Sequence, residues 1–166
     1  MYERAITTLQ RAEELPGADR STVRFNIGNN YLHLGDAERA HTAYTAAIET
    51  DSVAPDPYLN RANVNVSLGR YEEAVSDYNS VLGLEPDHPQ RERIEQMIAL
   101  LQGEIAEARR QAEEEQRLRE EAEARRRALL NNVLDSIKTS SEETENMSAG
   151  NEEIDTYEDD DLDIAD

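Results

Sequence analysis

The sequence predicts an all-α protein: a short solenoid of about two and a half helical hairpins, followed by a long charged helix and a disordered acidic tail. Three observations carry this prediction. A 34-residue segment is written twice between residues 21 and 88, its apolar residues recur at helical spacing, and glutamate and arginine alternate at helical spacing after residue 104. We therefore expect a repeat domain over residues 1–103, a charged helix over 104–138 and a tail over 139–166.

The internal repeat consists of identical residues 34 positions apart. The pairs are Asn26 and Asn60, Asn29 and Asn63, Leu34 and Leu68, Gly35 and Gly69, Glu38 and Glu72, Ala40 and Ala74, and Tyr44 and Tyr78. In each copy the glycine separates two helix-patterned halves, an alanine follows five residues later, and a tyrosine follows four residues after that. This pattern resembles the tetratricopeptide repeat.

The resemblance implies two antiparallel helical hairpins, near residues 21–54 and 55–88. Gly28 and Ala62 then lie where two helices cross closely, and Gly35 and Gly69 end the first helix of each hairpin. The pattern is weaker outside residues 21–88.

Two positions depart from the pattern of this family. Asn65 stands where Tyr31 supplies an aromatic ring one repeat earlier, and Arg24 stands where Tyr58 supplies one in the second repeat. We expect loose packing at both positions.

The remaining elements follow in order along the chain. Residues 2–14 align with the second helix of a repeat, so either they form an N-terminal capping helix, or the chain is a fragment that lacks an upstream half-repeat and a membrane anchor. The first hairpin is expected to begin at residue 21, with Ser21 or Thr22 as its N-cap. After residue 89 we expect a capping helix that covers the second repeat, and we favour its continuing through Gly103. Its apolar stripe is Ile94, Met97, Ile98, Leu101 and Ile105.

The charged helix is expected to be stable in water by itself. Residues 104–127 include eight glutamates and seven arginines, and correctly oriented pairs four residues apart contribute about 0.2–0.5 kcal/mol each. A helix over 104–138 would extend about 50 Å. The expected pairs are Glu113–Arg117, Glu115–Arg119, Glu121–Arg125 and Glu123–Arg127.

An apolar stripe ends this helix. Its residues are Leu129, Leu130, Val133, Leu134 and Ile137. Two interpretations stay open: the stripe folds back on the repeats, or it is a docking or self-association segment.

The charge of the chain excludes some classes of partner. The net charge is −20, and residues 138–166 hold 12 of the 37 acidic residues but one of the 17 basic residues. Such a chain is repelled by phosphate backbones and anionic lipid, so we expect no nucleic-acid partner. No apolar run of about 18 residues is present, so we expect no membrane insertion of this chain. A cytoplasmic location is favoured, and a periplasmic or membrane-tethered one remains open if residues upstream of Met1 are missing.

The sequence offers no catalytic arrangement. His33, His41 and His88 share no metal-ligand spacing, and there is no cysteine. We find neither a credible Ser-His-Asp set nor a phosphate-binding glycine loop. We therefore expect no enzyme activity, no cofactor and no metal.

The resemblance implies a binding surface on the concave face, which the first helix of each hairpin lines. A carboxamide both donates and accepts hydrogen bonds, so a ladder of asparagines can hold the backbone of an extended peptide. Alternatively, Asn26 and Asn60 only satisfy neighbouring helices. Including the apolar stripe, the candidate partner-binding residues are Phe25, Asn26, Asn29, His33, Asn60, Asn63, Arg93, Leu129, Val133 and Ile137.

Family members that hold the C-terminal carboxylate of chaperones place Lys and Arg around such an asparagine pair. Here Thr22 and Phe25 stand at the first basic positions and only Arg93 is available downstream, so that clamp is not expected. The sequence instead favours a protein–protein adaptor or scaffold that binds a peptide or helix of a partner. The alternatives are a self-assembling, homo-oligomeric structural protein whose 129–137 stripe docks into neighbouring repeats, or the soluble part of a membrane-anchored envelope complex.

Overall fold

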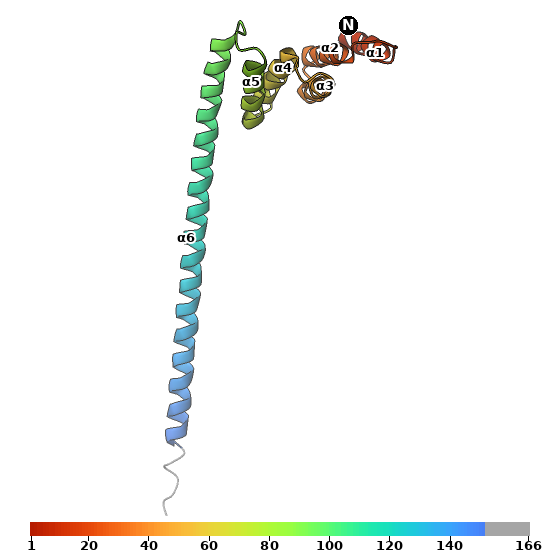
Figure 1. Ribbon diagram of the computed structural model, residues 1–166. Coiled ribbons are helices and arrows are strands. Elements are labelled where there is room, and N and C mark those ends of the chain that lie inside the picture. Colours follow the sequence, from red (N-terminus) through yellow and green to blue (C-terminus); the bar gives the residue numbers. More distant parts are fainter. Residues whose placement is uncertain (152–166) are drawn as a thin grey trace, which may run out of the picture. The chain divides into compact units, whose positions relative to one another are not determined.

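The described part of the chain is all-α, as the sequence predicts. The structure is a computed structural model that describes residues 1–151, with side chains described through residue 145. It divides into two compact units, Met1–Gln111 and a second one that begins at Ala112. The helices are α1 Tyr2–Glu13, α2 Arg20–His33, α3 Ala37–Thr50, α4 Pro55–Ser67, α5 Tyr71–Leu84 and α6 Arg91–Asn151 (Figure 1).

The two hairpins, α2/α3 and α4/α5, close in the same way. Gly35 and Gly69 have positive φ angles of 77° and 73°, a conformation that glycine adopts without steric cost. The next amide in each turn, of Asp36 or Arg70, donates to a carbonyl of the preceding helix at 2.9 Å. The predicted hairpin turns are therefore confirmed.

Close helix crossing explains the small residues of the repeat. A Cβ atom built on Gly28 would lie 2.5 Å from Cε1 of Tyr44, so only glycine fits at this contact between α2 and α3. The equivalent Ala62 on α4 is fully buried.

The core of the second hairpin is completed by the start of α6. Ile94 and Leu101 are buried against Ala74, Tyr78 and Val81, and Met97 and Ile98 pack beside them. The expected capping role of this stripe is confirmed for these residues.

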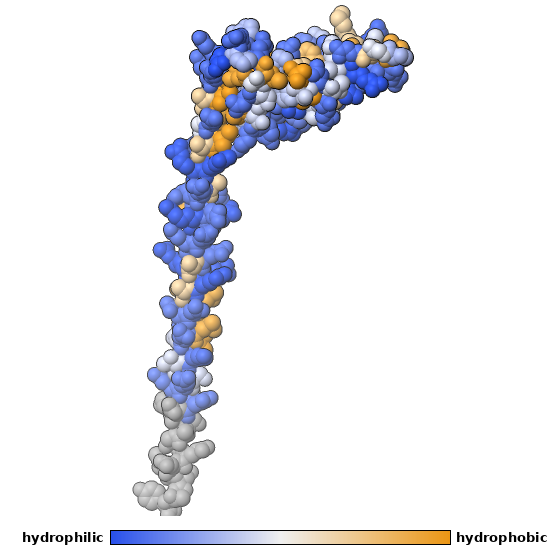
Figure 2. All heavy atoms as spheres, in the orientation of Figure 1, coloured by the Kyte–Doolittle hydropathy of each residue, from blue (hydrophilic) through white to orange (hydrophobic). Residues whose placement is uncertain are grey.

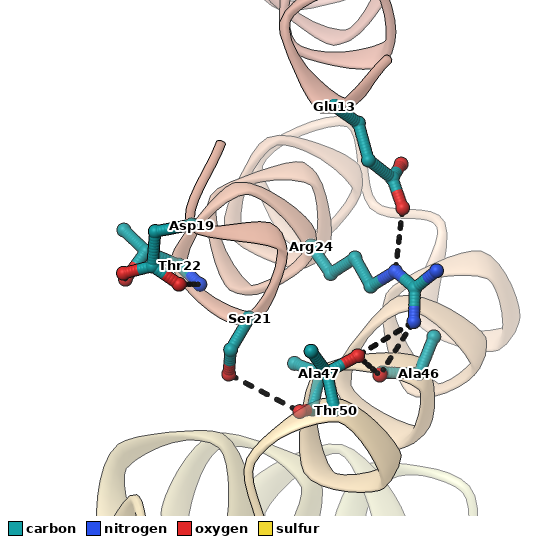
Figure 3. Close-up of polar contacts among 8 residues, drawn as sticks. All are labelled: Glu13, Asp19, Ser21, Thr22, Arg24, Ala46, Ala47 and Thr50. Carbon is teal, nitrogen blue, oxygen red and sulfur yellow. Dashed lines mark hydrogen bonds and ion pairs between the residues drawn. The ribbon is translucent and has the colours of Figure 1, made fainter. Parts of the chain in front are cut away.

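Arg24 is not loosely packed, and the expectation based on its missing aromatic ring is wrong. Its guanidinium joins three helices: Nε donates to Glu13 Oε1 at 2.6 Å, and Nη1 donates to the Ala46 carbonyl at 3.1 Å and to Thr50 Oγ1 at 2.7 Å (Figure 3). A polar cluster replaces the ring at the junction of α1, α2 and α3.

The start of α2 also differs from the prediction. The helix begins at Arg20, and the cap is Asp19, whose Oδ1 accepts from the Thr22 amide at 3.1 Å. Ser21 lies inside the helix and is buried, and its Oγ donates to the Ala47 carbonyl at 3.1 Å (Figure 3).

Asn65 is likewise tightly packed and 1% exposed. Its Nδ2 donates to Asp77 Oδ2 at 3.1 Å. The buried carboxylate of Asp77 also accepts from Arg61, Nε at 2.9 Å and Nη2 at 2.7 Å, and Arg61 Nη1 reaches Thr45 Oγ1 at 3.0 Å. The loose packing expected at Asn65 is therefore wrong, because hydrogen bonds replace the aromatic contacts.

Helix α6 runs without a break through Gly103, as favoured from the sequence. It also continues past residue 138 to Asn151, where the sequence suggested disorder. The sequence allows this continuation because no proline follows Pro89. Within it, the Thr139 and Thr144 hydroxyls donate to main-chain carbonyls four residues back. The rest of the predicted tail, residues 152–166, lies outside the described residues.

The ion pairs of α6 match the prediction in part. Arg119 pairs with Glu115 at 2.6 Å as expected. Arg117 pairs with Glu114 at 2.6 Å and with Glu121 at 3.8 Å, instead of with Glu113. The exchange is inexpensive, since exposed pairs at either helical spacing have similar energies. The expected pairs Glu121–Arg125 and Glu123–Arg127 are not formed among the described residues.

Helix α1 packs on α2 and buries Ile6. A search of the described helices for a segment able to span a membrane found no candidate.

Candidate functional site

Asparagines from α2 and α4 meet at the junction of the two repeats. Asn29 Oδ1 accepts a hydrogen bond from the Tyr44 hydroxyl at 2.8 Å and another from Asn60 Nδ2 at 2.9 Å. Burial raises the pKa of Tyr44 to about 12, so its hydroxyl stays protonated and remains a donor at neutral pH. One carboxamide oxygen thus joins α2, α3 and α4, while Asn29 keeps its own amide group for another acceptor.

The second repeat forms the same bond one repeat later. Asn63 Oδ1 accepts from the Tyr78 hydroxyl at 2.7 Å. Burial raises the pKa of Tyr78, and the nearby Arg93 lowers it in part. Asn63 is exposed, so its Nδ2 faces solvent-accessible space.

A shallow hollow of about 120 Å³ lies beside Asn63. It is formed by α4, α5 and the first turns of α6, all within the unit Met1–Gln111. Its lining combines amide donors, one guanidinium and three apolar side chains, which is suited to a mixed polar and apolar ligand. The lining residues are Leu59, Asn63, Tyr78, Gln90, Arg93, Ile94 and Met97.

We call four polar residues the asparagine surface: Asn63 and Arg93, which line the hollow, together with the hydrogen-bonded pair Asn29 and Asn60. Arg93 is exposed, and it brings a positive charge next to the amides in a chain whose net charge is −20. The surface can donate several hydrogen bonds and attract an acidic group at one end.

The other candidates on the repeats have different surroundings. Asn26 is half-buried, and its main-chain carbonyl accepts a hydrogen bond from Asn30 Nδ2 at 2.8 Å. The Phe25 ring packs against Tyr44 with centroids 5.9 Å apart, as part of the core. His33 stacks on Tyr2 of α1 at 4.8 Å. None of these three side chains is hydrogen-bonded to the asparagine surface in the described residues.

The apolar candidates lie in the second unit. Leu129, Val133 and Ile137 are 66%, 50% and 60% exposed on α6. They form a separate surface.

The sequence pattern identifies part of the hollow. It points to Asn63 and Arg93 but not to Gln90 and Met97, because the angle at which α6 meets α4 is not encoded in a local pattern. The Asn-to-Tyr bonds have a signal in the sequence: in both copies the tyrosine follows the asparagine by 15 residues.

The described side chains contain no group of three or more His, Cys, Asp or Glu residues able to hold a metal ion. The chemistry available at the asparagine surface is hydrogen bonding and charge attraction.

Comparison with known proteins agrees with this geometry. The tetratricopeptide repeat model matches residues 21–53 and 55–88. The second such domain of the human RPAP3 protein, solved in complex with the HSP70 peptide SGPTIEEVD, is 29% identical, with a TM-score of 0.53, over 61% of this chain and 81% of that one. The two hairpins over residues 21–88 are therefore tetratricopeptide repeats.

Two longer proteins also share sequence with it. A rice protein, the SGT1 homolog, is 41% identical over 51 residues, which are 31% of this chain and 14% of that protein. The co-chaperone DNJ1 of Cryptococcus neoformans, which has tetratricopeptide repeats and a J domain, is 29% identical over 96 residues, 58% of this chain and 18% of its own length. The matched segments thus span less than a fifth of either relative.

Proposed function

We propose that this protein is a non-enzymatic adaptor that binds an extended peptide segment of a partner protein on the asparagine surface. The observation that carries the proposal is that Asn63 and Arg93 line one hollow, while Asn60, three residues before Asn63 on α4, is hydrogen-bonded to Asn29 of the preceding repeat. The oxygens of Asn29 and Asn63 are already held by a tyrosine, which orients the amide donors before a ligand arrives. Such preorganisation lowers the entropic cost of binding.

The chemistry of the surface indicates the class of ligand. Amide donors spaced along α2 and α4 match the carbonyls of an extended backbone. Arg93 favours an acidic side chain or terminus at the α6 end, and Leu59 and Met97 favour an apolar neighbour. The proposal is supported by the peptide complex of the RPAP3 domain, a protein 29% identical to this chain. Because the basic positions of the carboxylate clamp hold Thr22 and Phe25 here, we do not expect the same ligand.

A selection experiment tests the proposal. A phage-displayed library of random peptides is selected on the full chain, and the recovered peptides are titrated against three variants. Arg93→Ala removes the charge of the hollow. Asn63→Asp keeps the oxygen that accepts from Tyr78 but removes the amide donor. Arg11→Ala removes an exposed arginine of α1 and is the matched control.

We expect both site variants to weaken binding at least about tenfold, the loss of one hydrogen bond to a charged or oriented group. The control variant should bind as the unaltered chain does. Peptides that bind all four proteins equally would place the ligand elsewhere and contradict the proposal.

A further inference from the structure

An unpartnered apolar face lies within the second unit of the chain. We call it the α6 stripe: Leu129, Leu130, Val133, Leu134 and Ile137, whose side chains are between 50% and 66% exposed. Figure 2 shows apolar side chains gathered on one side of this part of the helix, among hydrophilic ones. Five large apolar residues within nine positions expose more apolar surface than a helix in water usually does.

Opposite charges bracket the α6 stripe. Arg125, Arg126 and Arg127 precede it, and Glu142, Glu143 and Glu145 follow it. All six side chains are exposed. Through residue 145, where the description of side chains ends, none of them forms an ion pair, whereas Arg117 and Arg119 earlier in the helix do. The charges next to the stripe are thus positive before it and negative after it, and they are unpaired in the described residues, with Glu120, Glu121 and Glu123 standing before the arginines.

This arrangement is complementary to itself in one orientation. If two copies lie parallel, arginines face arginines and glutamates face glutamates, which is repulsive. If they lie antiparallel, the arginine-bearing end of each copy lies beside the glutamate-bearing end of the other, at both ends of the pair. Charges that flank an apolar seam set the orientation of paired helices in this way.

We propose that residues 125–145 of α6 form an antiparallel helix pair with the same segment of a second copy of this chain. Its twofold axis lies between Val133 and Leu134, so that Leu130 of one copy is opposite Ile137 of the other. Arg126 is then level with Ser141 of the second copy. A twofold interface needs one patch that is complementary to itself, and the order of the charges around the apolar stripe meets that condition.

The register makes a prediction for disulfide formation. The chain has no cysteine, so an introduced cysteine is unique. In the proposed pair, Arg126→Cys of one chain lies beside Ser141→Cys of the other, within disulfide reach. Two Arg126→Cys chains hold their thiols about 22 Å apart, because 15 helical residues separate the two levels at about 1.5 Å each.

The test uses full-length chains. The Arg126→Cys and Ser141→Cys proteins are oxidised separately and as a mixture, and linked dimers are measured on a non-reducing gel. We expect linkage in the mixture and little in either protein alone. Linkage of Arg126→Cys to itself would mean a parallel pair and would overturn the proposal.

Sedimentation measures the association without cysteine. The unaltered chain should sediment at twice its mass of 18.8 kDa, and Val133→Asp should weaken the dimer at least about tenfold, because it places a charge in the apolar seam. Leu118→Asp is the control, since Leu118 is 53% exposed on the same helix but outside the stripe. A monomeric unaltered chain, an equal effect of both variants, or crosslinks from the stripe to repeat residues 1–111 would each refute the antiparallel pair.

Discussion

Replacing Asp77 with alanine removes the carboxylate that holds Arg61 inside the repeat domain. The two side chains are 6% and 18% exposed and share two hydrogen bonds, at 2.7 and 2.9 Å. The buried Asn65 loses its Nδ2 acceptor as well. Breaking a buried pair from one side costs about 3–5 kcal/mol, and the partial exposure of Arg61 places the expected loss near the lower figure. For a unit of this size the melting temperature should fall by about 12 °C or more.

The first repeat supplies the experiment that separates this cause from a general loss of packing. Its equivalent positions are apolar or aromatic, and they pack without a buried charge. A triple variant that places the first-repeat residues at these positions removes Arg61 together with Asp77 and Asn65. It also removes Asn65 Oδ1, which receives no hydrogen bond from the described residues. We expect it to recover the stability lost by Asp77→Ala, since apolar replacement of a whole buried pair is neutral or stabilising. The three changes are Arg61→Ile, Asn65→Tyr and Asp77→Ala, after Ile27, Tyr31 and Ala43.

Urea denaturation of the full chain, followed by circular dichroism, gives the free energies of unfolding. Glu38→Ala is the control, because Glu38 and its partner Arg70 form an exposed pair, 63% and 37% exposed, of the kind that contributes less than about 1 kcal/mol. Two results would contradict this explanation. Either Asp77→Ala loses no more stability than Glu38→Ala, or the triple variant is less stable than both single variants. In either case the loss of stability would not come from leaving Arg61 buried without its carboxylate.

Three further predictions concern the repeat domain. Gly28→Ala should destabilise the protein by about 1–3 kcal/mol because its methyl group meets the Tyr44 ring. Gly103→Ala, with open space around it, should stabilise α6 by up to about 1 kcal/mol. Thermal melts compare the two variants, and a shift of the melting temperature in the same direction for both would contradict this prediction. Tyr44→Phe should lower the free energy of unfolding by about 1 kcal/mol, which is more than Tyr78→Phe should, because the asparagine partner of Tyr78 is exposed to water. The opposite order in urea denaturation would argue against a stabilising Tyr44–Asn29 hydrogen bond. Burial, with two nearby arginines, lowers the pKa of His41 below 6.5. The unfolded chain therefore takes up the proton first, and the free energy of unfolding falls as the pH drops through 6.5. The dependence of this free energy on pH should be weaker in His41→Gln, and an unchanged dependence would exclude this histidine as its source.

The hairpins could be predicted from sequence because their determinants are local. Gly35 and Gly69 require a positive φ angle, and Gly28 is the one residue that fits beneath Tyr44. Each of these constraints requires a particular residue type at a fixed spacing, and the spacing repeats after 34 residues. Such a repeated local constraint can be recognised from the sequence alone.

The replacements at Arg24 and Asn65 were not predictable in the same way. Each departs from the family pattern at one position, and its compensation lies in other helices: Glu13 and Thr50 for Arg24, and Asp77 for Asn65. Partners that lie far away in the sequence cannot be identified from a local pattern. The end of α6 is not predictable from composition either: polar residues after 138 are typical of disorder, but no proline follows Pro89 and the helix continues to Asn151.

The residue types of the asparagine surface can be read from the sequence, but the shape of the hollow cannot. The recurring asparagines and Arg93 were identified from spacing, but the hollow depends on how the first turns of α6 lie against α4 and α5. Phe25 illustrates the limit, since its place in the sequence does not show that the half-buried ring also packs against Tyr44.

The central claim is that a peptide segment binds the asparagine surface, and side-chain amide signals in nitrogen-15 NMR test it most directly. A library-selected peptide is titrated into the full chain, and the Asn NH₂ resonances are followed. We predict that the signals of Asn29, Asn60 and Asn63 shift together and saturate with one affinity, while that of Asn131, on α6, stays in place. Shifts confined to Asn131 and the α6 stripe, with the three repeat asparagines unmoved, would contradict this claim.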